Sequence, residues 1–594
     1  MLRSLHIFFF THMGSHCAMT VTRYPLTSFG PLYKSLDSTN CRSSILNYIV
    51  KIRIFHSMSQ PQSLIATNTS YSLYKLYASK ATSHFFSILL LSLLAVAAFV
   101  RCKTKNYLRT QTLRYLAERH NCAPIKQLKD NSLLPFGLTN VIKLARADLQ
   151  NRLPIAFAEG LEENGDTYSQ RMFGDTMLLT RDPRNIKAIL QNIQAFEVGT
   201  LRRNIFWPLL GAGIFTNDGV WWKRSRKLLT PIFKKPEIMD PSRLEPQVQD
   251  LLSTLREQSN TDQNGSSTTT INLSSALQST WHKIAMSLLF GDLPSSTSEP
   301  FAEALNNTLQ YLAERARFSA LYFLKNNKSF RRDTKTVHST LDTLISNPPG
   351  PETSPALSHI LSTTSNPTVT RYELLNLLFA ARDTSVAFTS WIFYALARSP
   401  SSFLKLKSEI VTVLGADPTI PPTTKHLAQL KYLDTFMAET LRLFPPIAVD
   451  GRMCSTHSIL PTGGGEAGDQ PIVVPAGTFV LYSILGLQRN TAIYGADAGR
   501  FRAERWEEVG MKERHLRGEW VPFNGGPRKC LGEQLAWLQV KYLVARILQR
   551  VRKIRVDGGE KEGGGNWVDE VKYRVDVGMS PEGGTRVIVE MEDD

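Results

Sequence analysis

The sequence predicts an α+β fold that combines long helices with short strands. Apolar residues recur at helical spacing from Leu531 to Ile547, and a long, mostly apolar helix is predicted from Leu374 to Ala397. Asp182-Pro183 is typical of the first residues of a helix. A glycine-rich loop and the strand-forming residues after it, from Leu460 to Ser483, indicate a hairpin. Residues 551–594 are predicted to form final strands separated by glycine loops.

The composition limits the class of protein. The chain has 594 residues, 42% of them hydrophobic, so it can hold one large domain or several smaller ones. Its six cysteines form no C-x-x-C pair, which favours reduced thiols in a cytosol-facing protein over a disulfide framework. The net charge of +17 is compatible with nucleic-acid binding, but the sequence contains no zinc-finger, RNP or helix-turn-helix signature. An anionic membrane surface and an acidic partner protein explain the charge better.

Residues 1–80 form an N-terminal extension of uncertain status. They contain one acidic residue, Asp37, and eight basic residues, with many serines and threonines. This composition is typical of a mitochondrial transit peptide. The alternative is that translation starts further in, for instance at Met58.

The next segment, residues 81–100, is predicted to be a transmembrane anchor. It is uncharged over 20 residues, the length that spans a bilayer, and four basic residues follow within nine positions. The positive-inside rule then predicts that the rest of the chain is cytosolic. A buried core helix is the alternative, but the segment has no polar face. Residues 101–135 are interpreted as a basic linker and hinge, and residues 136–594 as a catalytic domain.

Trp222 and Arg226 lie one helical turn apart in a W-x-x-x-R pattern. A planar guanidinium with several donors is well suited to bind a carboxylate. An aromatic and a basic residue at this spacing are also common on an ordinary surface face of a helix, so the pattern by itself is weak.

The long helix contains the polar sequence Ala380-Ala-Arg-Asp-Thr-Ser385. A charged pair such as Arg382-Asp383 inside an apolar helix is costly unless it is partnered or has a function. The simplest interpretation is a polar notch whose hydrogen bonds are all satisfied.

Glu439 and Arg442 form an E-x-x-R pair in a helix predicted to end at Pro445-Pro446. Pairs at this spacing occur on many surface helices, so the pair alone predicts little. Arg505 lies downstream in a Phe-Arg-Ala-Glu-Arg-Trp segment.

Cys530 lies on a turn made by Gly525-Gly526-Pro527, directly before the helix that begins near Leu531. At a helix start, the helix dipole and free N–H groups are expected to favour a thiolate. A lone thiolate is a poor zinc site but a good axial ligand for haem iron. The alternative is a buried structural cysteine. The spacing F-x-x-G-x-R-x-C-x-G over residues 523–532 resembles the haem-binding signature of the cytochrome P-450 superfamily.

This resemblance covers about residues 110–594 and implies a role for each motif. It implies a mainly α fold with a small β portion, after a single N-terminal transmembrane helix. Asp383 and Thr384 would be catalytic and deliver protons, and Glu439, Arg442 and Arg505 would form a structural ion pair. Cys530 would ligate the iron of haem b, and the cofactor-binding residues would be Cys530, Trp222, Arg226, Arg452, Arg528, Phe523 and Gly532.

The reaction implied is monooxygenation, with electrons from NADPH through NADPH–cytochrome P-450 reductase and cytochrome b5 as a second donor. The Ala-x-Arg-Asp-Thr form most resembles the fungal microsomal alkane and fatty-acid hydroxylase branch. The expected partners are therefore membrane lipid and an apolar small molecule, with no nucleic acid. The implied location is the endoplasmic reticulum membrane with a cytosolic catalytic domain, or alternatively the mitochondrion. Two alternative functions are the same chemistry on a terpenoid or polyketide and a non-enzymatic haem-binding protein.

Overall fold

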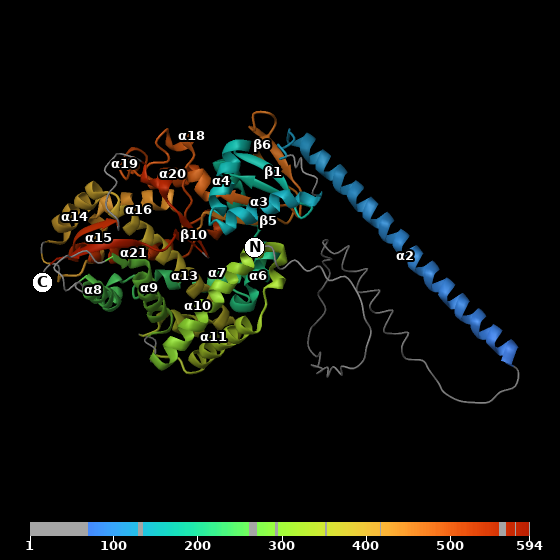
Figure 1. Cartoon of the computed structure of the whole chain (residues 1–594), viewed down its shortest axis with the longest axis horizontal. Coiled ribbons are helices and arrows are strands. Elements are labelled where there is room, and N and C mark those ends of the chain that lie inside the picture. Colours follow the sequence, from blue (N-terminus) through green and yellow to red (C-terminus); the bar gives the residue numbers. More distant parts are fainter. Residues whose placement is uncertain are drawn as a thin grey trace. The chain divides into compact units, whose positions relative to one another are not determined.

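A computed structural model describes residues 69–128, 135–259, 270–291, 295–350, 353–415, 417, 419–556, 566–576 and 578–592. By contacts the chain divides into two units, Met1–Arg109 and Thr110–Asp594. Figure 1 labels the elements.

The first unit contains most of the long helix α2 (Thr69–Arg119), and the sequence is helical over the predicted segment 81–100. Over the residues that the structure describes, no helix combines the length and the apolar content needed to cross a bilayer. The transmembrane anchor therefore stays a prediction. Residues 1–68, most of the predicted extension, lie outside the described residues.

The second unit is mainly helical. Its α-helices after α2 are α3 (Leu138–Leu149), α4 (Leu153–Asn164), α5 (Pro183–Gln191), α6 (Gly199–Leu210), α7 (Gly219–Leu229), α8 (Glu245–Ser259), α9 (Leu273–Phe290), α10 (Ser295–Phe318), α11 (Lys328–Ser346), α12 (Pro355–Thr363), α13 (Pro367–Ala397), α14 (Pro400–Leu414), α15 (Thr424–Gln429), α16 (Lys431–Leu443), α17 (Ile484–Gln488), α18 (Thr491–Tyr494), α19 (Arg505–Glu508), α20 (Met511–Arg517) and α21 (Glu533–Arg550).

Helix starts follow the sequence signals closely. Asp182 caps α5, as its side chain accepts hydrogen bonds from the N–H groups of Arg184 and Asn185. The predicted helix from Leu374 begins seven residues earlier, at Pro367, where Asn366 caps the first turn. The proline at the first helical position has no N–H to satisfy, which is why the helix starts there.

The strands form small sheets. A five-stranded sheet has the order β1 (Thr167–Met172), β2 (Asp175–Thr180), β8 (Phe479–Ser483), β5 (Val449–Cys454) and β3 (Phe196–Glu197), and only β2 and β8 are parallel in it. The other sheets are β6 (Ser458–Gly464) with β7 (Gln470–Val474), β10 (Tyr573–Val575) with β11 (Met579–Pro581), and the three-stranded β4 (Thr270–Asn272), β12 (Arg586–Met591) and β9 (Val551–Val556).

The predicted hairpin between Leu460 and Ser483 is only partly correct. β6 and β7 pair antiparallel, with Ser458 opposite Val474. The chain then leaves this hairpin at a turn that contains Gly477, whose φ is +86°. Because this turn redirects the chain, residues 479–483 pair with β2 and β5 instead.

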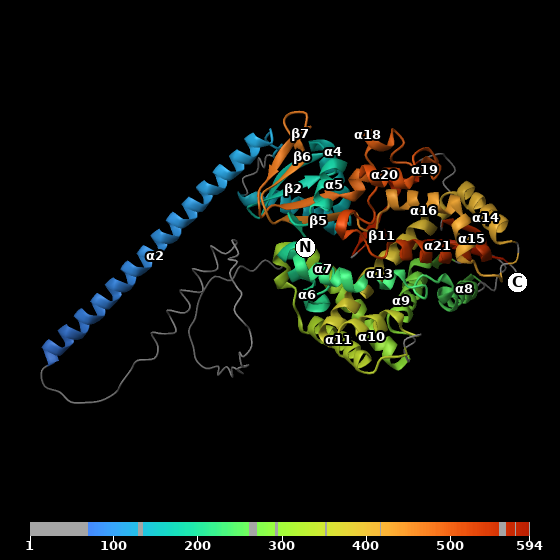
Figure 2. The ribbon, with the colours of Figure 1, turned by 180° about the vertical axis from the view of Figure 1, so that it is seen from behind.

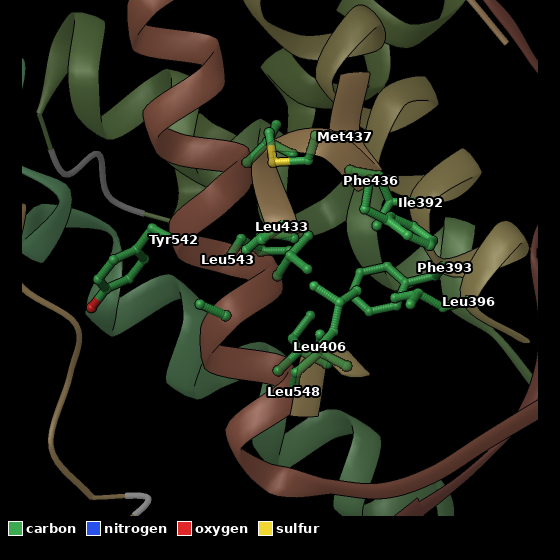
Figure 3. Close-up of a cluster of buried hydrophobic side chains, with 14 of the residues drawn as sticks. Ile392, Phe393, Leu396, Leu406, Leu433, Phe436, Met437, Tyr542, Leu543 and Leu548 are labelled. Atoms are coloured by element: carbon green, nitrogen blue, oxygen red, sulfur yellow. The ribbon is translucent and has the colours of Figure 1, made fainter. Parts of the chain in front are cut away.

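The largest core cluster holds together the helices that carry the candidate site. Figure 3 shows side chains of α13, α14, α16 and α21 meeting in it. Ile392 and Leu396 of α13, Leu406 of α14, and Leu433 of α16 are each fully buried there. Burial of a leucine or isoleucine side chain contributes about 1.5–3 kcal/mol, so this cluster fixes α13 relative to α21. Figure 2 shows the strands β2, β5, β6 and β7 gathered at one end of the second unit, away from α8, α14 and α15.

Candidate active site

Cys530 lies on a tight loop that ends where α21 begins. The N–H of Cys530 donates to the carbonyl of Phe523 at 3.0 Å, which closes the loop. Gly526 has φ +64°, and a Cβ there would lie 2.2 Å from the carbonyl oxygen of Leu190. Only glycine fits this position, because it has no Cβ. The cysteine loop can therefore pack closely against α5.

The Cys530 thiol is accessible and yet desolvated. The residue retains exposed surface, while burial raises the pKa of its thiol. The Gly532 N–H, Arg226 and Lys529 lower the pKa but do not outweigh burial. The Gly532 N–H thus acts in the direction that the helix start predicts, and burial has the larger, opposite effect on the pKa.

Two arginines and a tryptophan surround the cysteine loop. The Nη1 of Arg226, on α7, donates to the carbonyl of Lys529 at 2.9 Å. The guanidinium of Arg528 lies 4.6 Å from the centroid of the buried Trp222 ring, and that of Arg226 lies 5.7 Å from it. The structure thus brings the W-x-x-x-R pair of α7 together with the loop, about 300 residues away in the sequence.

Arg452 belongs to a second charged group, which surrounds Asp450 on β5. Its Nη1 donates to Asp450 at 2.8 Å, and Arg202 of α6 forms a second ion pair with the same carboxylate. Tyr482 and Asn524 also donate to Asp450, at 2.9 and 3.1 Å. Burial raises the pKa of Asp450, but the two arginines outweigh burial and hold it well below its ordinary value.

Sequence reasoning missed Asp450 and Arg202. Asp450 had a local signal, because it lies two residues before Arg452 and residues at this spacing share one face of a strand. Arg202 had no such signal, since its partner is 248 residues away.

These residues fit a haem, whose two propionates need cationic partners. The Nε of Arg528 is buried and has no hydrogen-bond partner among the described residues. Burial lowers the pKa of Arg528 to about 10, and the charges of Arg452 and Arg202 lower it further, even though Asp218 lies 2.7 Å away and raises it. A buried guanidinium with an unused donor is suited to a further anion. Haem, when bound, supplies an iron that the Cys530 sulfur would ligate and that activates dioxygen.

The polar notch of α13 lies within an uninterrupted helix. The Thr384 hydroxyl donates to the carbonyl of Ala380, and the Ser385 hydroxyl to that of Ala381, both at 2.7 Å. Both hydroxyls thus bond one turn back along their own helix, as serine and threonine commonly do.

Asp383 is less well satisfied than these hydroxyls. Within the described part of the chain, its ion-pair partner is the Nε of Arg382 at 3.6 Å, a long contact. Burial raises its pKa, Arg382 lowers it, and Asp576 raises it further. The net direction is upward, so this carboxyl binds a proton more readily than an ordinary aspartate does. Gly578 lies beside it, since a Cβ at Gly578 would be 3.8 Å from the Asp383 carbonyl oxygen.

Glu439 is the centre of a fully buried ion-pair network. Arg442 contacts it through two bonds of 2.8 Å, and Arg505 through one of 3.1 Å. The Trp506 indole N–H and the Arg502 backbone N–H complete its shell at 3.1 and 2.9 Å. The remaining Arg442 donors bind backbone carbonyls. The network joins α16 to α19 and its preceding loop.

Another buried carboxylate, Glu373 of α13, fixes α7. It accepts a hydrogen bond from the Ser225 hydroxyl and one of 3.2 Å from the Ile214 N–H. Burial raises its pKa to about 7. Since Ser225 lies between Trp222 and Arg226, this contact positions both of them.

A mainly helical fold with an accessible cysteine on a glycine turn, flanked by arginines, is the arrangement that haem-thiolate proteins require. Residues 135–561 match the family model described as "Cytochrome P450". The chain belongs to the cytochrome P450 family and has its fold, mostly helical with small sheets; it is a monooxygenase of that family, and the family implies a haem cofactor.

Several fungal proteins are similar over most of their length. "Cytochrome P450 monooxygenase g430" of Fusarium sp is 32% identical over 494 residues, which cover 77% of this chain and 85% of the relative. "Cytochrome P450 52A13" of Debaryomyces hansenii is 34% identical over 470 residues, or 74% and 87% of the two chains. "Cytochrome P450 52A10" of Candida maltosa is 33% identical over 469 residues, or 73% and 88%.

Proposed function

We propose that this protein hydroxylates an apolar chain, a fatty acid or an n-alkane. The reaction is RH + O2 + 2 e⁻ + 2 H⁺ → ROH + H2O, with electrons from NADPH through a flavoprotein reductase and with cytochrome b5 as a second candidate donor. The observation that carries the proposal is the accessible Cys530 beside Arg528, whose buried Nε has no partner among the described residues.

Each site residue has a role in this proposal. Cys530 ligates the iron, on a loop shaped by Phe523 and Gly532, and Trp222, Arg226, Arg452 and Arg528 hold the propionates. Asp383 holds a proton at its carboxyl, which its raised pKa supports. The Thr384 hydroxyl donates to the Ala380 carbonyl. Rotation about one side-chain torsion breaks this hydrogen bond, and the hydroxyl can then pass a proton on.

The preference for an apolar substrate is supported by three phenylalanines. Three rings pack against one another with centroids 5.2 to 5.6 Å apart: Phe206 of α6, Phe215 between α6 and α7, and Phe379 of α13. Phe379 lies one helical turn before Asp383, so the two share one face of α13. Apolar rings beside the proposed proton donor are suited to a hydrocarbon chain and exclude water.

The test of the iron ligand is spectroscopic. The reduced protein with CO should absorb at about 450 nm, as thiolate ligation requires. Cys530→Ala should abolish this band, while Cys454→Ala, which removes another free thiol, should leave it in place. A band that survives Cys530→Ala would contradict the assignment.

The test of the substrate is a binding-spectrum screen of fatty acids, n-alkanes and terpenoids, followed by product analysis with a reductase and NADPH. Saturable binding and hydroxylation of an alkyl chain are expected. Turnover of terpenoids or polyketides alone would establish the alternative of a secondary-metabolite hydroxylase. Haem binding without NADPH consumption would indicate a non-enzymatic haem protein.

We also propose that residues 81–100 anchor the protein in the endoplasmic reticulum membrane with the catalytic domain in the cytosol. The support is the sequence alone: 20 residues without a charge, followed by Arg101, Lys103, Lys105 and Arg109. Membrane association should resist salt and carbonate, because apolar contact is not screened. Release by carbonate, or a catalytic domain protected from protease in intact vesicles, would contradict this topology. Cleavage of the N-terminus with mitochondrial recovery would establish the transit-peptide alternative.

A further inference from the structure

The Arg382 side chain of α13 is buried and reaches α10. Its side chain is 3% exposed. Its Nη2 donates to the side-chain oxygen of Asn306 on α10, and its Nε is 3.6 Å from Asp383. Among the described residues, Nε and Nη1 have no hydrogen-bond partner. A buried guanidinium normally uses its donors, so these two nitrogens require an explanation.

His282 of α9 has the same property. Both of its ring nitrogens are buried and have no hydrogen-bond partner among the described residues. Burial, and after it the charge of Arg382, lowers the pKa of His282 to about 4. The imidazole is therefore neutral near pH 7, with one N–H donor and one acceptor nitrogen.

The packing of α9 on α13 keeps these groups in place. The indole N–H of Trp281 donates to the Thr389 hydroxyl at 3.1 Å, and the Ser274 and Ser390 hydroxyls are 3.0 Å apart. These contacts lie along the interface of the two helices and fix α9 against α13 up to the residue before His282.

The unpartnered nitrogens of Arg382 and His282 limit which kind of molecule can satisfy them both. The guanidinium offers only donors, whereas the neutral imidazole offers a donor and an acceptor. An anion would satisfy the donors but leave the imidazole acceptor unpaired. Water both donates and accepts, and buried water commonly bridges polar groups of this kind.

We propose that Arg382 and His282 form a buried hydrated site between α9 and α13, with the exposed Asn306 of α10 at its rim, and that this site positions the Asp383 carboxyl for proton delivery. The three are positioning residues, because they act through Asp383. The inference rests on the proposed function, since Asp383 matters here as a proton donor.

The first test is the crystal structure of the haem-loaded full chain. Ordered water should lie within hydrogen-bond distance of Arg382 Nη1 and of a His282 ring nitrogen. In His282→Phe this water should be lost and the Asp383 carboxyl displaced. A dry site, or water with an unmoved carboxyl in the variant, would overturn the proposal. This readout does not depend on turnover, so it separates the proposal from the proposed function.

The second test measures where the electrons go. With a reductase and the hydroxylated substrate, His282→Phe and Asn306→Leu should keep the CO band and KM. The ratio of hydrogen peroxide to product should rise by about tenfold, the order of effect of losing one buried hydrogen-bond network. The solvent isotope effect on product formation should also change. His282→Gln, which retains a donor and an acceptor, should restore coupling.

Thr308→Val is the control on the same helix, since Thr308 is fully buried and, among the described residues, its hydroxyl donates to the carbonyl of Leu305. It should leave the peroxide ratio unchanged. If His282→Phe fails to bind haem, His282→Met replaces it, because methionine adapts to irregular space. An unchanged ratio in the apolar His282 variant and in Asn306→Leu, or an equal rise in Thr308→Val, would refute the positioning role.

Discussion

Glu439 and Asp383 are both carboxylates of the helical core with arginine neighbours, but their surroundings differ. Glu439 on α16 is 0% exposed and accepts hydrogen bonds from two guanidiniums, an indole and a backbone N–H. Asp383 on α13 is 25% exposed, and its Arg382 neighbour is 3.6 Å away. Two nitrogens of that arginine, Nε and Nη1, have no hydrogen-bond partner among the described residues.

The difference indicates what each charge is for. A network in which every donor and acceptor is paired has no capacity left for a substrate or a proton, so it holds elements together. A group that is buried but incompletely paired costs folding free energy, and such groups concentrate at functional sites. Glu439 is therefore interpreted as structural, and Asp383 as functional.

The largest effect is expected from breaking the paired network. Glu439→Gln removes the buried counter-charge of Arg442 and leaves Arg505 with Asp497 as its carboxylate partner, which costs about 3–5 kcal/mol of unfolding free energy. We expect little folded, haem-loaded protein, measured by haem content and thermal unfolding of the purified chain. Wild-type haem content in this variant would show that the network is dispensable.

The next effect is expected at the incompletely paired group and should spare the fold. Thr384→Ala and Asp383→Asn should retain haem and the unfolding temperature. Coupled product formation should fall by about 10²–10⁴-fold, the usual range for general acid–base groups, while hydrogen peroxide increases. Product, peroxide and NADPH measured together give the result. Undiminished coupling in both variants would make this notch structural.

Glu373 is hydrogen-bonded like Glu439 but lacks an ion pair like those of Glu439, since its hydrogen-bond donors, Ser225 and the Ile214 N–H, are neutral. Its pKa is raised from 4.5 to about 7 in the folded protein, so between these values the native state binds more protons than the unfolded state. Its contribution to stability is thus present at low pH and is lost as the pH rises toward 7. Glu373→Gln should remove this dependence, on the order of 3 kcal/mol at 1.36 kcal/mol per pKa unit.

The measurement is the unfolding temperature of wild type and Glu373→Gln at about pH 5 and about pH 8. The difference between the two proteins should be larger at the higher pH, in favour of the variant. Parallel pH profiles would show that Glu373 is not the titrating group.

The smallest effect is expected at a charged pair on the surface. Arg517 and Glu513 of α20 are 2.9 Å apart, and each is 53% exposed. Arg517→Ala should change the unfolding free energy by less than about 1 kcal/mol, because solvent screens an exposed pair. Denaturant titration compares it with Glu439→Gln, and an effect of similar size in both would remove the contrast between buried and exposed pairs.

The sequence alone determined the features that depend on short-range chemistry. The turn before Cys530 requires glycine at Gly526, where φ is positive. The sequence Gly525-Gly526-Pro527 predicts such a turn without any knowledge of the fold. The Glu439–Arg442 pair and the Trp222–Arg226 pair lie within one helical turn, so each pair could be recognised in the sequence, and the family resemblance gave it a role. The capping residue Asp182 marked the start of its helix for the same reason.

Only the tertiary structure decided which charges are paired and which are not. Arg202 meets Asp450 across 248 positions, and His282 approaches Arg382 only because α9 packs on α13. The same is true of the Cys530 pKa, since burial by distant segments outweighs the local helix start. Desolvation and long-range partners depend on what the fold brings close, and spacing along a chain does not contain that information.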